Sequence, residues 1–188
     1  MEIDGAFAFG VSEALLAQEG LFKGKELSLE QVGFLRQASK EDKLYEKALG
    51  FLSYRPRSQK EVELYLRKKV EQGDIIETVL TRLENQGYLN DTSFARWWVE
   101  QRTQGKNPKG PAVVKAELYQ KGVAHPVVEE VLGEVKMGGD LVKKAALSRS
   151  SRLKGLDKVT FKRRLSTYLL RRGFLWEQVK PVVDELAN

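Results

Sequence analysis

The sequence predicts an all-α protein of three tandem three-helix repeats forming an elongated curved array, with a small N-terminal accessory segment ahead of them. Apolar residues recur at matching positions about every 50 residues, which indicates repeated supersecondary units. Within each unit their spacing follows i, i+3, i+4 and i+7, the pattern of an amphipathic helix. Helix-capping residues stand at the borders of these stretches. We expect the accessory segment at 1–43 and the repeats at 44–90, 91–139 and 140–188.

Composition narrows the class of protein. The 188 residues are 41% apolar and 31% charged, too apolar for a disordered chain and too charged for a membrane protein. Cysteine is absent and His125 is the single histidine. The chain therefore has no thiolate to bind a metal and only one imidazole for metal binding or acid–base catalysis. No apolar run approaches the roughly 20 residues that span a bilayer, and residues 1–10 lack the basic start of a signal peptide. We expect a cytoplasmic protein that is not an enzyme and binds no cofactor or metal.

The first forty residues differ from the rest. Asp4-Gly5 is a turn signal, and the alternating stretch after it predicts a short β-hairpin. Ser12–Glu19 and Ser28–Gln37 read as two helices. Residues 20–25 have the glycines and lysine of a phosphate-binding loop, but three spacer residues replace four. We therefore expect no nucleotide site there.

The prediction of three repeats is based on six apolar positions that align in three copies. A shift of 52 residues superimposes the first copy on the second, and a further 51 superimposes the second on the third. The aligned residues are Val62, Leu66, Ile76, Val79, Leu80 and Leu83; then Val114, Leu118, Val128, Val131, Leu132 and Val135; then Leu165, Leu169, Val179, Val182, Val183 and Leu186. An earlier stripe precedes each pair of helices and comprises Leu44, Ala48, Leu49 and Leu52; Phe94, Trp98 and Val99; and Leu141, Ala145 and Leu147. Each repeat is therefore three short helices, nine in all.

Capping residues define the helix boundaries. Ser58 and Glu61 form a capping box, in which the serine accepts from the Glu61 amide while the glutamate reaches back. Gly110-Pro111 holds the same place in the second repeat, with proline in the first turn of a helix. Asp157 or Thr160 can serve in the third. Left-handed caps, each a glycine followed by an apolar residue, are predicted at Gly87, Gly122 and Gly173.

Two runs of residues resemble the signatures of a known family. Residues 48–62, Ala-Leu-Gly-Phe-Leu-Ser-Tyr-Arg-Pro-Arg-Ser-Gln-Lys-Glu-Val, followed by Tyr-Leu-Arg-Lys-Lys at 65–69, resemble the opening signature of the RecX family. Residues 87–91, Gly-Tyr-Leu-Asn-Asp, with Phe-Ala-Arg-Trp-Trp-Val at 94–99, resemble its second signature. The resemblance covers about 44–187.

The resemblance implies a modulator of the recombinase RecA in DNA repair, homologous recombination and the SOS response. Such a protein binds in the groove of the RecA–DNA filament, opposes filament extension, and damps ATPase, strand exchange and co-protease activity. The implied partner is the RecA filament on DNA, with weak direct binding to single- or double-stranded DNA and no membrane. We expect the protein to act as a monomer. A helical array can present one continuous face to several protomers.

Charge is concentrated near the C-terminus. Residues 1–43 carry a net charge of −3, 44–91 of 0, 92–139 of +2 and 140–188 of +7. A segment this basic favours contact with a polyanion. Basic residues off the apolar stripes are the candidates for contact with the filament or DNA, and they are Arg55, Arg57, Lys60, Arg67, Lys68, Arg96, Arg102, Lys106, Lys109, Lys115, Lys121, Lys143, Lys144, Arg149, Arg152, Lys154, Lys162, Arg163 and Arg171.

Two other functions fit the same residues. A direct nucleic-acid binder would use one helical pair as a helix-turn-helix module and compete for single-stranded DNA. No repeat, however, shows a helix in which base-reading Asn, Gln and Arg occur together. A general peptide-binding scaffold would depend on neither DNA nor recombinase.

Overall fold

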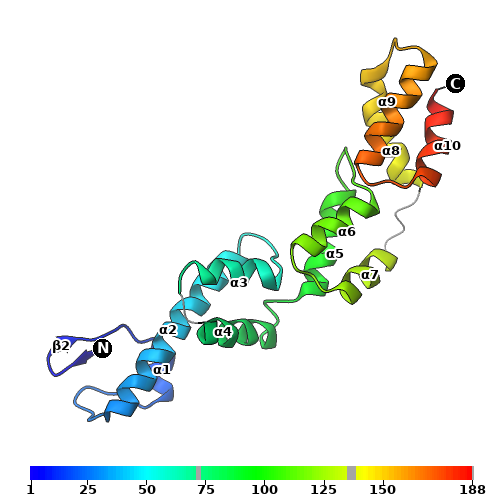
Figure 1. The fold of residues 1–188 in the computed structure, drawn as a ribbon. Coiled ribbons are helices and arrows are strands. Elements are labelled where there is room, and N and C mark those ends of the chain that lie inside the picture. Colours follow the sequence, from blue (N-terminus) through cyan, green and yellow to red (C-terminus); the bar gives the residue numbers. More distant parts are fainter. Residues whose placement is uncertain (71–72, 135–138, 188) are drawn as a thin grey trace. The chain divides into compact units, whose positions relative to one another are not determined.

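A computed structural model describes residues 1–70, 73–134 and 139–187 of the chain (Figure 1). It consists of two compact units, Met1–Leu89 and Asn90–Asn188. The described residues form β1 (Glu2–Ile3), β2 (Ala6–Phe7), α1 (Glu13–Gln18), α2 (Leu29–Leu52), α3 (Gln59–Arg67), α4 (Gly73–Asn85), α5 (Asp91–Thr103), α6 (Pro111–Gln120), α7 (His125–Glu134), α8 (Gly139–Ser150), η1 (Ser151–Leu153, a 3-10 turn), α9 (Lys158–Arg171) and α10 (Trp176–Leu186).

The predicted N-terminal hairpin is confirmed. Strands β1 and β2 pair antiparallel, with Ile3 opposite Ala6. The turn between them places Asp4 and Gly5 at φ 51° and 79°, both left-handed, as a two-residue hairpin turn requires. Helix α1 follows, with the Ser12 side chain accepting from the Leu15 amide at its N-terminus.

Helix α2 is longer than the sequence pattern indicated. The predicted Ser28–Gln37 helix and the first helix of the first repeat are one continuous helix of 24 residues, so the expected division after residue 43 falls inside it. Residues 38–43 contain no glycine or proline that would interrupt a helix. The N-terminal half of α2 buries Leu35 against the accessory segment, and the C-terminal half buries Leu44 in the first repeat. One helix therefore serves two cores.

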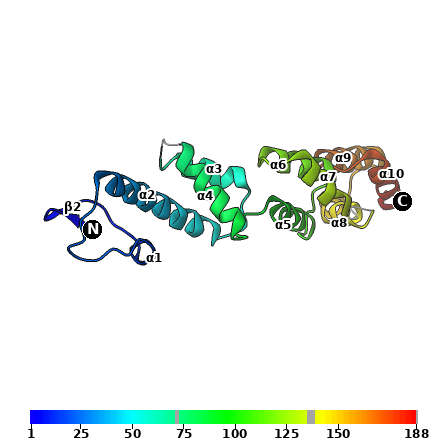
Figure 2. The same ribbon diagram turned by 90° about the horizontal axis from the view of Figure 1, so that it is seen from below.

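Each repeat has its own helix trio and its own core. In the first, α2, α3 and α4 contact one another; in the second, α5, α6 and α7; in the third, α8, α9 and α10. Figure 2 shows α3 and α4 side by side near the C-terminal part of α2. A separate cluster of buried apolar residues lies within each trio. This arrangement confirms the three-helix repeats predicted from the 50-residue periodicity.

The aligned apolar positions are the core positions. In the described residues all of them are buried except Leu132 and Leu186, which are half-buried against the clusters of their repeats. Val135 lies outside the described residues. The prediction was wrong at Leu147, whose side chain is 51% exposed. The buried residues of α8 are Val142, Ala145 and Ala146. Leu147 is the next residue along the helix and lies outside this buried face.

The predicted caps are also confirmed. Ser58 and Glu61 form the capping box of α3, and α6 begins at Pro111. Asp157 caps α9 by accepting from the Thr160 amide at 2.9 Å. Gly87, Gly122 and Gly173 all have positive φ angles, of 75°, 82° and 87°.

Candidate polyanion-binding surface

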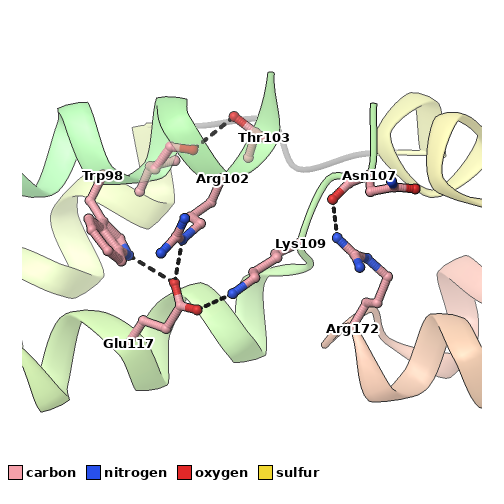
Figure 3. A network of polar contacts seen from close by, with 8 residues as sticks. Trp98, Arg102, Thr103, Asn107, Lys109, Glu117 and Arg172 are labelled. Atoms are coloured by element: carbon pink, nitrogen blue, oxygen red, sulfur yellow. Dashed lines mark hydrogen bonds and ion pairs between the residues drawn. The ribbon is translucent and has the colours of Figure 1, made fainter. Parts of the chain in front are cut away.

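The loop of residues 104–110, between α5 and α6, is held by one carboxylate on α6. The Glu117 carboxylate accepts from Trp98 Nε1 at 3.0 Å and from Arg102 Nε at 2.8 Å, both on α5 (Figure 3). Lys109, at the end of the loop, donates to its other oxygen. The carboxylate therefore ties the C-terminal half of α5 and the end of the loop to α6.

Two opposing effects act on the pKa of the Glu117 carboxyl. Partial burial raises the pKa of this carboxyl, whereas hydrogen bonds and charge from Lys109 and Arg102 lower it further than burial raises it. The net result is a pKa below the ordinary value of 4.5. A carboxyl with a depressed folded-state pKa stabilises the folded state above its unfolded-state pKa, and this contribution is lost as pH falls through the folded value.

The network predicts a pH-dependent difference in stability between wild type and Glu117→Gln. We expect the wild type to be more stable near neutral pH, because glutamine keeps the shape of the side chain but not the charge that Arg102 and Lys109 face. The difference in the free energy of unfolding should shrink as pH falls below about 4.5, where the unfolded-state carboxyl becomes protonated. Urea unfolding followed by tryptophan fluorescence measures it, since Trp97, Trp98 and Trp176 all lie in the second unit. A difference that stays constant down to pH 3 would contradict the network.

The second and third repeats meet through their backbones. The Gly110 amide donates to the Arg172 carbonyl at 2.7 Å, and the Ala112 amide to the Gly173 carbonyl at 3.2 Å. A Cβ atom on Gly110 would lie 2.3 Å from the Gly173 carbonyl group, and one on Gly173 would lie 2.5 Å from the Val113 nitrogen. Only glycine fits at either position, because the two chains approach more closely than a side chain permits.

Side chains extend this contact along the loop. Arg172 Nε donates to the Pro108 carbonyl at 2.9 Å, and its guanidinium also donates to the Asn107 carbonyl (Figure 3). The Asn107 side-chain oxygen accepts from Ser148 at 2.8 Å, and Lys144 donates to the Gln104 carbonyl at 3.0 Å. The loop of the second repeat is therefore held by α8 and α9 of the third.

Beside this contact lies a cavity lined mainly by arginines. Its volume is about 580 Å³, and its lining comprises Arg149, Arg163, Arg164, Thr167, Tyr168, Arg171 and Arg172. Arg149 comes from α8, and the other six residues come from α9 and its C-cap. None of the lining residues is acidic. We call this cavity the arginine pocket.

The arginine pocket is an unbalanced concentration of positive charge. Arginine stays protonated at any physiological pH, so mutual repulsion among the five guanidinium groups is not relieved by loss of a proton. Arg163, Arg164 and Arg171 are exposed, and none forms an ion pair with a described residue. Arg149 Nε is buried without a hydrogen-bond acceptor among the described residues. Planar guanidinium forks are well suited to phosphate and carboxylate oxygens, so the pocket is chemically fitted to an anionic ligand.

The structure places the nineteen basic candidates in three groups. Eight are paired with acidic side chains, namely Arg55 with Glu61, Arg67 with Glu63, Arg96 with Glu134, Arg102 and Lys109 with Glu117, Lys115 with Glu129, Lys143 with Glu185, and Lys162 with Asp184. These pairs compensate charge within the chain. In particular, Lys162 Nζ lies 2.6 Å from Asp184 Oδ1 on α10 and does not line the pocket with Arg163 and Arg171.

Four further candidates contact aromatic rings or backbone. Arg57 lies 4.0 Å from the centre of the Phe51 ring, and burial together with the neighbouring Arg55 lowers the pKa of its guanidinium. Lys121 packs over Trp98, Arg149 over Tyr168, and Lys144 holds the loop as described above. The remaining seven form no ion pair with any described residue, and they are Lys60, Lys68, Lys106, Arg152, Lys154, Arg163 and Arg171. Of all nineteen, the pocket brings together Arg149, Arg163 and Arg171.

Sequence reasoning missed two of the five pocket arginines. Arg164 and Arg172 stand next to Arg163 and Arg171 in the chain. The missed signal is the spacing of Arg164, Tyr168 and Arg172, which are four residues apart and therefore share one face of α9. Their neighbours Leu165 and Leu169 are buried, so this arginine face borders the apolar stripe.

Tandem three-helix repeats with separate cores define a helical-repeat protein, and its third repeat carries a cationic cavity. Comparisons with known proteins agree with this class. The family model "RecX, first three-helix domain" matches residues 45–83, and "RecX, second three-helix domain" matches residues 90–132. Together with relatives that are 33% identical over nearly the whole chain, these matches show that the chain belongs to the RecX family of regulatory proteins.

Relatives and solved structures extend the match over nearly the whole chain. Regulatory protein RecX of Listeria monocytogenes is 33% identical over 99% of this chain and 70% of its own length. That of Bacillus cytotoxicus is also 33% identical, over 97% of this chain and 68% of its own. A crystal structure of regulatory protein RecX matches with a TM-score of 0.80 at 26% identity, covering 97% of this chain and 91% of the other. RecX from Lactobacillus salivarius matches with a TM-score of 0.69 at 27% identity, over 79% and 97%.

The described residues also bear on two other kinds of site. No helix in the described ranges has both the length and the apolar character needed to cross a bilayer. No cluster of three or more His, Cys, Asp or Glu side chains in those ranges has the geometry to hold a metal ion.

Proposed function

We propose that this protein is a negative regulator of RecA. It binds in the groove of the RecA–DNA filament, blocks filament extension, and damps ATPase, strand exchange and co-protease activity. Membership of the RecX family supports this function. So does the repeat organisation, because a series of three-helix units presents surface to more than one protomer of a polymer.

The arginine pocket is the observation that carries the proposal. A nucleoprotein filament is a repeating array of anionic groups, and a regulator that binds it needs cationic groups that are not already neutralised. Arg163 and Arg171 meet this requirement, since both are exposed and form no ion pair with a described residue. Lys162 and Lys143, in the same repeat, are already paired with acids on α10. Arg152 and Lys154 likewise form no ion pair with a described residue but lie outside the pocket, so the pocket is where unpaired arginines of the third repeat line one cavity.

ATP hydrolysis by RecA on single-stranded DNA tests the proposed activity. We expect inhibition when this protein is added at well below one copy per RecA protomer, because blocking a growing end stops many later additions. Binding to bare single-stranded DNA, measured in the same buffer, should be too weak to account for that inhibition. Unchanged ATP hydrolysis at all ratios would contradict the proposal.

Reversing the charge of the pocket should remove the inhibition. The variant Arg163→Glu with Arg171→Glu leaves the Lys162–Asp184 pair intact and changes only exposed side chains, so helicity and the melting temperature should stay at wild-type values. We expect the concentration needed for half-inhibition to rise about tenfold or more, since each site gains repulsion as well as losing attraction. The matched control reverses Lys23 and Lys47 in the first unit, which are exposed. Equal inhibition by both variants would show that the pocket plays no part.

Competition for single-stranded DNA is the second candidate function, and the same pocket favours it. Under that mechanism inhibition appears only when the protein saturates the strand. Affinity for bare DNA would then fall steeply with salt, with a log–log slope of about −0.7 for each phosphate neutralised. The ratio of protein to RecA at half-inhibition separates the two functions.

A further inference from the structure

We infer that the arginine pocket binds consecutive phosphate groups of a nucleic-acid strand, without reading its bases. The inference rests on the proposed function for its setting, the RecA–DNA filament, and deepens it by naming the part of that filament which the third repeat contacts. The chemical argument for phosphate binding depends only on the residues that line the pocket.

The charge of the pocket favours anionic oxygens as ligands. Five guanidinium groups converge on about 580 Å³, within the range of roughly 300–1,000 Å³ that is usual for ligand sites. The lining holds no carboxylate, and Arg149 Nε is buried without an acceptor among the described residues. A bound phosphate would supply acceptor oxygens and compensating charge together. Arginine and phosphate match in geometry as well, because two N–H groups can bond two oxygens in parallel.

The shape of the arginine set favours a strand over a compact anion. Arg163 and Arg171 are eight residues apart on α9, which corresponds to about 12 Å along the helix axis. Arg164 lies between them, and all three side chains are exposed. A single phosphate ion cannot span that length. A run of phosphates along a flexible strand can, and it can approach from solvent without any opening movement of the protein.

The aromatic residue of the pocket is not free to stack on a base. The guanidinium carbons of Arg149 and Arg172 lie 5.2 and 5.5 Å from the centre of the Tyr168 ring, and the ring also packs against the core of the third repeat. Proteins that bind single strands through stacking present an open ring to each base. Here the ring supports two arginines instead. The contacts available to a strand are therefore phosphate contacts, which carry no sequence information.

The arginines divide into two roles. Arg163, Arg164 and Arg171 are the exposed groups that would contact phosphate. Arg172 already donates to the Asn107 and Pro108 carbonyls, so it is a positioning residue that fixes the pocket against the loop of the second repeat. The test should leave Arg172 unchanged, because its loss would disturb the contact between repeats.

Fluorescence anisotropy of a short labelled oligothymidylate tests the inference with the full chain. The variant carries Arg163→Gln, Arg164→Gln and Arg171→Gln; the matched control carries Lys23→Gln, Lys40→Gln and Lys47→Gln, which remove three exposed charges from the first unit. We expect at least a tenfold loss of affinity in the pocket variant and a salt dependence shallower by about 2 on the log–log scale, three phosphates at about 0.7 each. The control should keep most of the slope. Oligoadenylate should show the same losses, because the bases are not read.

Other outcomes would overturn the inference and are distinct from failure of the proposed function. Equal loss in the pocket variant and the control would mean that strand binding follows net charge alone. If the pocket variant binds the strand as tightly as the wild type but no longer inhibits RecA, the pocket contacts an acidic protein surface. The proposed function would then still stand. Tight binding of inorganic tripolyphosphate with none of the oligonucleotide would indicate a compact ligand. Absence of RecA inhibition by the wild type would refute the proposed function while the strand measurements still decide the pocket.

Discussion

Alanine at Gly173 is expected to destabilise the second unit by about 2–5 kcal/mol, the sum of two separate costs. The residue has a φ of 87°, where a Cβ atom costs about 1–2 kcal/mol. The same Cβ would lie 2.5 Å from the Val113 nitrogen, and overpacking of this kind costs about 1–3 kcal/mol. Urea unfolding monitored by tryptophan fluorescence measures the sum, since Trp97, Trp98 and Trp176 all lie in this unit.

Two other glycines separate these costs. Gly155 has a φ of 86°, and a Cβ atom added there would meet nothing within 4 Å, so Gly155→Ala should show only the backbone cost. Gly110 has a φ of −80°, and its added Cβ would lie 2.3 Å from the Gly173 carbonyl, so Gly110→Ala should show only the clash. If Gly110→Ala unfolds like the wild type, the close backbone contact between the second and third repeats does not exist in solution.

Leu169→Ala should cost about 2–5 kcal/mol in the free energy of unfolding, because the side chain is fully buried in the core of the third repeat and alanine leaves a cavity. The matched control is Leu147→Ala. That leucine lies on α8 of the same repeat but is 51% exposed, so the change should stay within about 0.5 kcal/mol. Thermal unfolding of both variants measures the contrast. Similar losses in the two would mean that the buried face of α8 is assigned wrongly.

The two series report on different levels of organisation. Leu169 tests a core that a single repeat builds from its own three helices. The glycines test how one repeat is attached to the next, where backbone amides and carbonyls replace side-chain packing. The arginine pocket lies next to this attachment, and Arg172 belongs to both. Loss of pocket function in a glycine variant would therefore reflect a displaced loop, whereas loss in Arg163 or Arg171 variants reflects the missing charge.

Local patterns predicted most of the fold. The spacing of Leu165 and Leu169 identified the buried face of α9, and Ser58 with Glu61 identified the start of α3. These features are decided within a few residues, since a helix cap and an apolar stripe depend only on neighbours along one or two turns. Helix α2 was missed for the same reason. Its two apolar stripes belong to different cores, so the pattern changes in the middle of the helix although the backbone does not.

The candidate site was predicted only in outline. The basic third repeat is evident from its net charge of +7 over residues 140–188. The sequence does not show which of these basic residues pair with an acid, because their partners lie on other helices. Lys162 and Arg163 are adjacent in the chain, yet one pairs with Asp184 on α10 and the other lines the pocket. Electrostatic pairing acts over a few ångströms in space and leaves no periodic trace in the sequence.

The three helical repeats, their caps, their core residues and the basic character of the last repeat all follow from the order of amino acids, because each depends on local spacing or on composition. The site depends on how the helices pack. Packing of α8 against α9 brings Arg149 to the arginines of α9, and the approach of Gly110 to Gly173 attaches the second repeat to the third. Both features join residues far apart in the chain, whose proximity no pattern within one helix can set.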